Sequence, residues 1–450
     1  MSDLFIIGAS GTKAYRTAMA AISENIANAS TDGYTRRSVT TRESGSSSAT
    51  MVFYQNREMF GGTYVSSVNR AVDPYLDATV RMTSQSLSSS TSRLRWMTDV
   101  QTALNDGSTG IGQRLSTMFG TMEKLAASPN DTSLRTTTLS SIEQVAEAFR
   151  ATAADLKDSS AGIATEAQAS VDKVNSALDE LARVNNSLLR AQPGSSSYAQ
   201  LLDSRDAAVK TVTDALDVSV TFSGNDQTSI SFGGTTLLAN TTATPLTLTV
   251  NGDGTLALGT AAGALATPGN GTLGGLFTSA GVAAQQRTAL DTLAAQFVTD
   301  MNAWHAQGLT TPTTADPAGH AGIPLLSIGT GADSIAMLVT DTAELATRSS
   351  DGTLNGNLLN ATTALRGTGS VEQGWTALVA GHATLTASTS AEQTAAQTRN
   401  DQAVTARENV SGVDLDMEAA DLLRIQQAYS GCAKILQAAR DTVDAILQIM

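Results

Sequence analysis

The feature that most constrains this chain is a seven-residue repeat of apolar side chains that runs to its last residue. The first row of the repeat is Leu415, Leu422, Tyr429, Leu436, Val443 and Met450, and the companion row is Ile425, Cys432, Ala439 and Ile446. This spacing places both rows on one stripe of an α-helix and is typical of a coiled-coil seam. Because an isolated helix of this kind is only marginally stable in water, the C-terminus needs a partner helix.

A second amphipathic helix is predicted near the N-terminus, over residues 10–29. One face carries Tyr15, Met19, Ile22 and Ile26, with alanines beside them. Since each terminal helix exposes an apolar stripe, we expect the two to pair with each other and with neighbouring copies of the chain. The coiled coil is predicted to comprise residues 1–42 and 409–450, and the side chains of both helices named above are its predicted assembly interface.

Start signals and apolar stripes predict further helices between the two ends. Asp73 before Pro74 is typical of an N-cap followed by proline at the first helical position, and a second start lies at 128–131. One stripe consists of Val171, Val174, Leu178, Leu181 and Leu188, interrupted by the polar Asn185; another consists of Leu290, Leu293, Phe297 and Met301, and ends at Gly308. We therefore predict a helical domain over residues 43–217 and 282–408, with a largely irregular segment at 309–356.

Residues 218–281 differ in pattern, because apolar and polar side chains alternate there with a period of two. Asp226 and Asp253 are the only charged residues between Ser219 and Gly281. Turn signals separate the alternating runs, and Asn251–Gly254 is a good hairpin candidate. We predict a small antiparallel β domain inserted between helices, with a flexible Gly/Thr linker as the alternative. The predicted fold class is mainly α with a β-rich insert.

Composition excludes several classes of partner and location. The 450 residues include 28 Lys and Arg against 42 Asp and Glu, so the formal charge is −14 and neither nucleic acid nor an anionic membrane is expected to bind. Apolar runs are far shorter than the roughly 20 residues that a membrane-spanning helix needs. Asp3 stands where a secretory signal would carry Lys or Arg, so the classical cleaved-signal route is not expected.

Motifs that can indicate small-ligand or metal binding favour structural interpretations here. The glycines from Gly269 to Gly274 have the G-x-G-x-x-G spacing of a dinucleotide site, but Asp291 lies inside a helical stripe and little strand sequence precedes them. Asn251–Gly254 lacks the acidic ligands of a calcium loop. The one cysteine, Cys432, lies in the seam and is expected to pack as a small hydrophobe, with a disulfide between neighbouring copies as the alternative.

Candidate catalytic residues are also scarce. Asp203 and Asp206 lie one helical turn apart, but Arg205 between them favours structural ion pairs. His305, His320 and His382 are far apart in the sequence and lie in no catalytic motif. We therefore predict no catalytic, cofactor-binding or metal-binding residues, no cofactor and no enzyme activity.

The two terminal segments resemble a known family. Residues Asn25 to Arg36 resemble the N-terminal signature of bacterial flagellar rod, hook and hook-associated proteins, and Ser411 to Tyr429 resemble the C-terminal motif of the members at the hook–filament junction. Interior segments around Gly62–Asp73, Leu202–Asp206 and Leu290–Gly308 also resemble segments of this family, and they follow one another in the same order as in the family. The chain departs from the pattern at Asp414 and Asp421, where the family usually has asparagine, and at Gly431 and Cys432.

The resemblance implies a structural role outside the cell. Family members are exported by the flagellar type III apparatus, pair their terminal helices along the axis of the flagellum, surround this core with a helical rod-like domain and point a β domain outward. The implied partners are hook protein, a second hook-associated junction protein (hook-associated protein 3), an export chaperone at the C-terminal region, and further copies of the chain in a helical homo-oligomer.

Two other hypotheses remain at this point. The chain is a hook or filament subunit of the same axial family, or it carries an enzyme in the central insert. The insert has no His, Cys, Lys, Arg or Glu. General acid–base chemistry would therefore depend on Asp226 and Asp253 alone.

Overall fold

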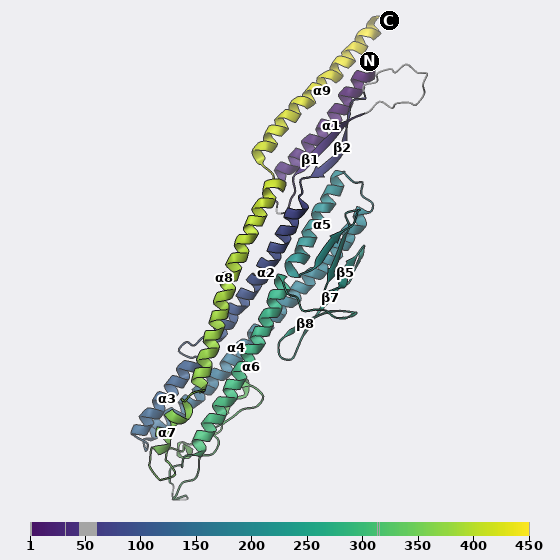
Figure 1. The fold of residues 1–450 in the computed structure, drawn as a ribbon. Coiled ribbons are helices and arrows are strands. Elements are labelled where there is room, and N and C mark those ends of the chain that lie inside the picture. Colours follow the sequence, from purple (N-terminus) through teal and green to yellow (C-terminus); the bar gives the residue numbers. More distant parts are fainter. Residues whose placement is uncertain (1, 32, 45–60, 313, 315, 450) are drawn as a thin grey trace. The chain divides into compact units, whose positions relative to one another are not determined.

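The computed structural model describes residues 2–31, 33–44, 61–312, 314 and 316–449. It is built mainly of long helices, with short antiparallel strands between them (Figure 1). The helices are α1 (Ser2–Ala27), α2 (Pro74–Ala103), α3 (Ile111–Ala127), α4 (Thr132–Leu188), α5 (Ser196–Ala215), α6 (Gly271–Ala306), α7 (Gly356–Leu365), α8 (Val371–Ser411) and α9 (Leu415–Ile449). The predicted fold class is confirmed. Among the described residues, no helix is both long and apolar enough to cross a membrane.

The chain divides into two compact units, each assembled from separate stretches of sequence. Unit 1 comprises Met1–Ser86, Asp172–Leu246 and Ala396–Met450, and unit 2 comprises Leu87–Val171 and Thr247–Ala395. Helices α2, α4 and α8 contribute residues to both units. Both termini therefore belong to unit 1.

Side-chain caps explain where several helices begin. The Asp73 carboxylate accepts hydrogen bonds from the backbone N–H groups of Tyr75 (2.8 Å) and Leu76 (3.3 Å), and α2 starts at Pro74, as predicted. Asp131 caps α4 in the same way, through Ser133 N at 2.8 Å and Leu134 N at 3.1 Å. Such caps satisfy backbone donors that have no partner within the first helical turn.

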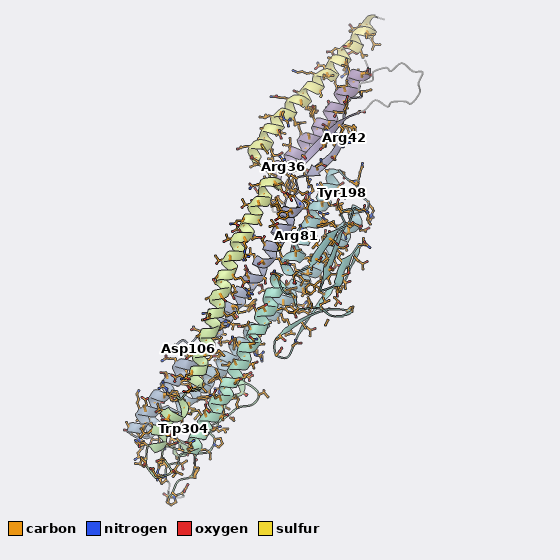
Figure 2. All side chains as sticks on the ribbon, in the orientation of Figure 1. Arg36, Arg42, Arg81, Asp106, Tyr198 and Trp304 are labelled. Carbon is orange, nitrogen blue, oxygen red and sulfur yellow. The ribbon has the colours of Figure 1, made fainter. Side chains whose placement is uncertain are left out.

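The two predicted apolar stripes are buried. In unit 1, Val184 and Leu188 of α4 pack with Tyr198 of α5. In unit 2, Phe297 of α6 stacks on Phe149 of α4, with ring centroids 5.6 Å apart. Trp304 of α6, labelled in Figure 2, is also buried and donates to Asn357 O at 2.9 Å. Each of these contacts joins residues of the same unit.

The central β region forms two small antiparallel sheets. One contains β3 (Ser219–Phe222), β4 (Thr228–Phe232), β5 (Thr235–Ala239) and β6 (Thr242–Ala243), and the other contains β7 (Leu246–Val250), β8 (Leu256–Thr260) and β9 (Gly263–Ala264). The predicted hairpin at Asn251–Gly254 joins β7 to β8, with Gly254 at φ 90°. The predicted insert, 218–281, differs from the structure at its end, because Asn270 caps α6 and residues 271–281 are helical.

Two further pairs of strands lie outside this region. Strands β1 (Arg37–Glu43) and β2 (Thr63–Arg70) form an antiparallel ladder that the sequence did not predict. The described residues of the segment predicted to be irregular form the short elements β10 (Leu326–Ser327), β11 (Ala336–Met337), η1 (Ala332–Ser334) and η2 (Thr342–Glu344), and α7 begins at its last residue, Gly356.

Candidate assembly interface

The terminal helices α1 and α9 of unit 1 lie side by side (Figure 1). Two glycines of α1 permit the close approach. A Cβ atom added to Gly8 would lie 2.7 Å from Cγ of Leu436, and one added to Gly11 would lie 2.6 Å from Sγ of Cys432. Both distances are shorter than any normal contact between carbon or sulfur atoms. The helix pair therefore depends on these positions having no side chain.

The C-terminal residues predicted for the interface differ in burial. Ala439 is buried, whereas Leu415 and Ile446 are exposed. The half-buried residues are Leu422, Ile425, Tyr429, Cys432, Leu436 and Val443. Met450 lies outside the described residues.

On α1 the most buried positions are small residues that the sequence analysis did not single out. Ala14, Ala21 and Asn25 are buried, while the predicted residues Tyr15, Met19, Ile22 and Ile26 are half-buried. Gly8, Gly11, Ala14 and Ala21 recur at intervals of three to seven residues. That small-residue spacing is the sequence signal for these positions, and a pattern of large apolar side chains does not include it.

Large apolar side chains remain exposed on both terminal helices. On α1, Leu4, Phe5 and Ile6 are exposed, and on α9 the exposed fractions of Leu423 and Leu447 reach 62% and 65%. Burial of an apolar side chain contributes about 1.5–3 kcal/mol. An exposed apolar surface on paired helices is typical of a site where another protein chain binds.

A buried polar cluster closes one end of the helix pair around Asn25, which is fully buried. Its Nδ2 donates to Arg37 O at 2.9 Å and to the Glu418 carboxylate at 3.0 Å. Its Oδ1 accepts from Arg37 N and from the Tyr34 hydroxyl, both at 2.9 Å. Burial is the main cause that raises the pKa of Tyr34 to about 12, so its hydroxyl stays a donor. Every hydrogen-bonding position of the Asn25 amide is therefore used.

The start of α9 joins the same cluster. Glu418 is buried, and Arg36, labelled in Figure 2, lies 3.7 Å from its carboxylate. Arg36 N donates to Ser411 O at the end of α8. Asp414 caps α9 by accepting from Asp416 N at 3.0 Å and Met417 N at 3.1 Å. The N- and C-terminal signature segments thus contact each other directly.

Ion pairs extend the cluster to α5. The Arg37 guanidinium binds Glu24 at 2.6 Å and Asp203 at 2.7 Å, and Arg70 binds Asp203 at 2.8 Å and Asp206 at 2.6 Å. Burial opposes the charge of Arg37, but the hydrogen bond and charge of Asp203 outweigh it and raise the pKa of the guanidinium. The structural ion-pair role predicted for the two aspartates is confirmed, with Arg37 and Arg70 as partners that the sequence did not indicate.

A groove of about 900 Å³ lies where the signature segments meet. It is lined by residues of the loop after α1, such as Tyr34 and Arg36, and by Val410, Val413 and Met417 around the turn between α8 and α9. Val410 and Met417 are 45% and 54% exposed. The groove adds a concave, partly apolar surface to the exposed faces of the terminal helices.

The residues considered for catalysis and ligand binding make contacts that stabilise the fold. His305 is buried, with Nδ1 2.6 Å from Ile323 O and Nε2 accepting from Ala346 N at 2.9 Å. The glycines at 269–274 form the capped start of α6. No group of three or more His, Cys, Asp or Glu side chains able to hold a metal ion occurs within the part of the chain that the structure describes.

Known families match the chain in three segments. The model of the "Flagellar hook-associated protein FlgK helical domain" family matches residues 97–322, which is half of the chain. The chain belongs to this FlgK family. Residues 6–35 match the family "Flagella basal body rod protein", and residues 407–449 match "Flagellar basal body rod FlgEFG protein C-terminal". The matched ends contain most of α1 and all of α9, the two helices of the candidate interface.

Individual relatives carry names of the same kind. Flagellar hook-associated protein 1 of Salmonella typhimurium is 27% identical over 342 residues, which cover 73% of this chain and 60% of the relative. The Bacillus subtilis protein of that name is 24% identical over 212 residues, covering 46% of this chain and 42% of the relative. The chain therefore spans about 60% of the length of the first of these relatives.

A solved structure also resembles the chain. It is the flagellar hook junction protein FlgK from Burkholderia pseudomallei, with a TM-score of 0.48 and 22% identity, and the match covers 57% of this chain and 47% of that one.

Proposed function

We propose that this chain is a structural subunit of the bacterial flagellum that joins the hook to the filament by helical polymerisation through its terminal helices. The observation that carries the proposal is that α1 and α9 pair with each other yet keep large apolar side chains exposed. Neighbouring copies offer the same apolar surfaces and provide a means of burying them. The relatives named hook-associated protein 1 support the place of this subunit in the flagellum.

The proposal assigns parts and partners to the chain. Residues 1–42 and 409–450 form the axial core, residues 43–217 and 282–408 the surrounding helical domain, and 218–281 the outward β-rich region. Hook protein lies on one side and hook-associated protein 3 on the other, while an export chaperone holds the C-terminal region before secretion by the type III apparatus. The chain has a structural rather than an enzymatic role.

A strain lacking this chain tests the proposed place in the flagellum. We expect hooks without filaments in electron micrographs, with filament subunits released into the medium. Loss of the hooks themselves would instead identify a hook subunit, and normal filaments would contradict any junction role.

A substitution on the exposed face tests the proposed surface. We expect Leu423→Asp to leave the unfolding of the monomer unchanged, because this side chain is 62% exposed, but to abolish motility and incorporation at the hook tip. Gln437→Asp, at an exposed polar position of α9, is the matched control and should assemble normally. Normal filaments in the Leu423→Asp strain would show that this face of α9 is not an assembly surface.

A further inference from the structure

Two asparagines of α4 hold the β region through their side-chain amides. Asn185 donates from Nδ2 to Thr228 O at 2.8 Å and accepts at Oδ1 from Thr228 N at 2.9 Å. Asn175 does the same with Leu246, at 3.0 and 2.7 Å. Each amide therefore pairs with both backbone groups of a single residue, as a neighbouring strand would.

The same arrangement recurs on two other helices. Asn25 of α1 pairs with the N–H and C=O of Arg37, both at 2.9 Å. Asn302 of α6 pairs with those of Leu326, at 3.0 and 2.8 Å, and its Oδ1 also accepts from Leu325 N at 2.8 Å.

The backbone residues that these amides contact share one position. Arg37, Thr228, Leu246 and Leu326 are the first residues of β1, β4, β7 and β10. A helix asparagine thus marks the point where each of these strands begins.

Strand pairing alone specifies the registers of β4 and β10 weakly, whereas β1 pairs with β2 along its whole length. The strands have two to seven residues, and β4 pairs with β5 only from Phe232 to Ile230. At Thr228 the Asn185 amide takes the place of a ladder partner on the β5 side, and it also donates to Asn240 O just after β5. A shift of one residue would move every side chain of a strand to the opposite face. An amide that fits one N–H and one C=O at a fixed helix position opposes such a shift.

We propose that Asn25, Asn175, Asn185 and Asn302 are register clamps, positioning residues that fix where β1, β4, β7 and β10 dock on their helices. A side-chain amide supplies a donor and an acceptor side by side at neutral pH, whereas an ionised carboxylate only accepts. The stripe of α4 is interrupted at Asn185 because the clamp needs a polar group there. Asn25 also binds Glu418, so its clamp couples the start of β1 to the first turn of α9.

Residue-resolved hydrogen exchange of the full chain tests the clamps. In Asn185→Asp the carboxylate faces Thr228 O without a proton, so we expect exchange of the β4 and β5 amides to accelerate about tenfold or more while β7 and β8 change little. In Asn175→Asp we expect the reverse pattern. Asn186→Asp, at the exposed neighbouring position of α4, is the matched control and should leave both sheets protected.

Acidification gives a second readout that a general packing defect would not produce. A protonated carboxyl group has one donor and one acceptor, like the amide it replaces. Relative to the unsubstituted chain at the same pH, both Asp variants should regain protection at about pH 4, where the carboxyl group protonates, and Asn185→Leu should not.

The clamp proposal is overturned by any of three results. The first is that each Asp variant loses protection equally in both β sheets. The second is that each behaves like Asn186→Asp. The third is that a variant unfolded at neutral pH stays unfolded at about pH 4. Recovery restricted to each variant's own strand supports the clamps.

Discussion

At the scale of single residues, the terminal helix pair depends on a contact between Gly11 and Cys432. The Sγ atom of Cys432 occupies the space where a side chain on Gly11 would begin. The single cysteine is half-buried in this contact and acts as a small apolar residue.

Substitution of Gly11 tests this contact. We expect Gly11→Ala to destabilise the α1–α9 pair by about 1–3 kcal/mol, since the new methyl group overlaps Sγ. Chemical denaturation followed by hydrogen exchange of α1 and α9 amides measures the change.

The matched control removes the obstructing atom. In Gly11→Ala with Cys432→Ala the sulfur is absent, and the nearest remaining atom of residue 432 lies 3.6 Å away, an ordinary contact. The double variant should therefore recover most of the lost stability. Equal instability of the single and double variants would show that the close approach is not the cause.

At the scale of an element, the first turn of α9 is set by Asp414. Its carboxylate accepts two backbone hydrogen bonds and carries a negative charge at a helix N-terminus, where the helix dipole favours it. The turn between α8 and α9 therefore has a defined geometry at the edge of the candidate groove.

We expect Asp414→Ala to cost about 1 kcal/mol, because two N–H groups of the first turn lose their acceptor. Exchange of the Asp416 and Met417 amides should accelerate accordingly. Asp414→Asn keeps an acceptor at the cap and should stay within a few tenths of a kcal/mol of the original chain. If the Asn variant frays as much as the Ala variant, the side-chain cap is not what starts α9.

At the scale of the whole molecule, the two units differ in their response to pH because all three histidines lie in unit 2. Burial is the main cause that lowers the pKa of His305 from its ordinary value of 6.5. The unfolded chain therefore binds a proton at this imidazole below about pH 6.5 that the folded unit does not bind. The free energy of unfolding of unit 2 should fall as the pH falls through this value.

His320 has the opposite effect on how the stability of unit 2 depends on pH. Hydrogen bonds to Asp316 and Glu344 raise its pKa, so its contribution is present at low pH and is lost as the pH rises through the raised value. This imidazole is exposed, so we expect the effect of His305 to dominate.

Hydrogen exchange in urea at about pH 7.5 and about pH 5.5 measures the free energy of unfolding of each unit by itself. We expect unit 2 to lose stability on acidification and unit 1 to change less. His305→Gln should flatten the dependence of unit 2, and His320→Gln, the exposed control, should make it slightly steeper. Equal losses in both units would contradict the assignment to His305.

Much of the helical framework was predictable because its signals are local. Asp73 and Asp131 cap helices through bonds to residues two and three positions on. The stripe from Leu290 to Met301 is buried on one face of α6, as its spacing along the chain predicts. The hairpin at Asn251–Gly254 is equally local. The terminal signatures determined the family, which the matching family models confirm.

Only the tertiary structure decided which residues of different segments meet. Asp203 could have paired with the neighbouring Arg205, but the fold brings it Arg37 and Arg70. The β1–β2 ladder was missed because each strand is stabilised by a partner at least 20 residues away in the chain. The start of α6 at 271–281 was missed although its cap, Asn270, is the preceding residue.

For the candidate interface, too, the sequence determined some features and the tertiary structure decided the others. The seven-residue repeat determined that the C-terminus is a helix in need of a partner, because periodicity along one helix records which side is apolar. It could not show that Gly8 and Gly11 lie under Leu436 and Cys432, because the repeat of one helix does not specify which residues of its partner face it. Asn25 likewise interrupts its helix face as a polar residue, and its use emerges only when Arg37 and Glu418 fold against it.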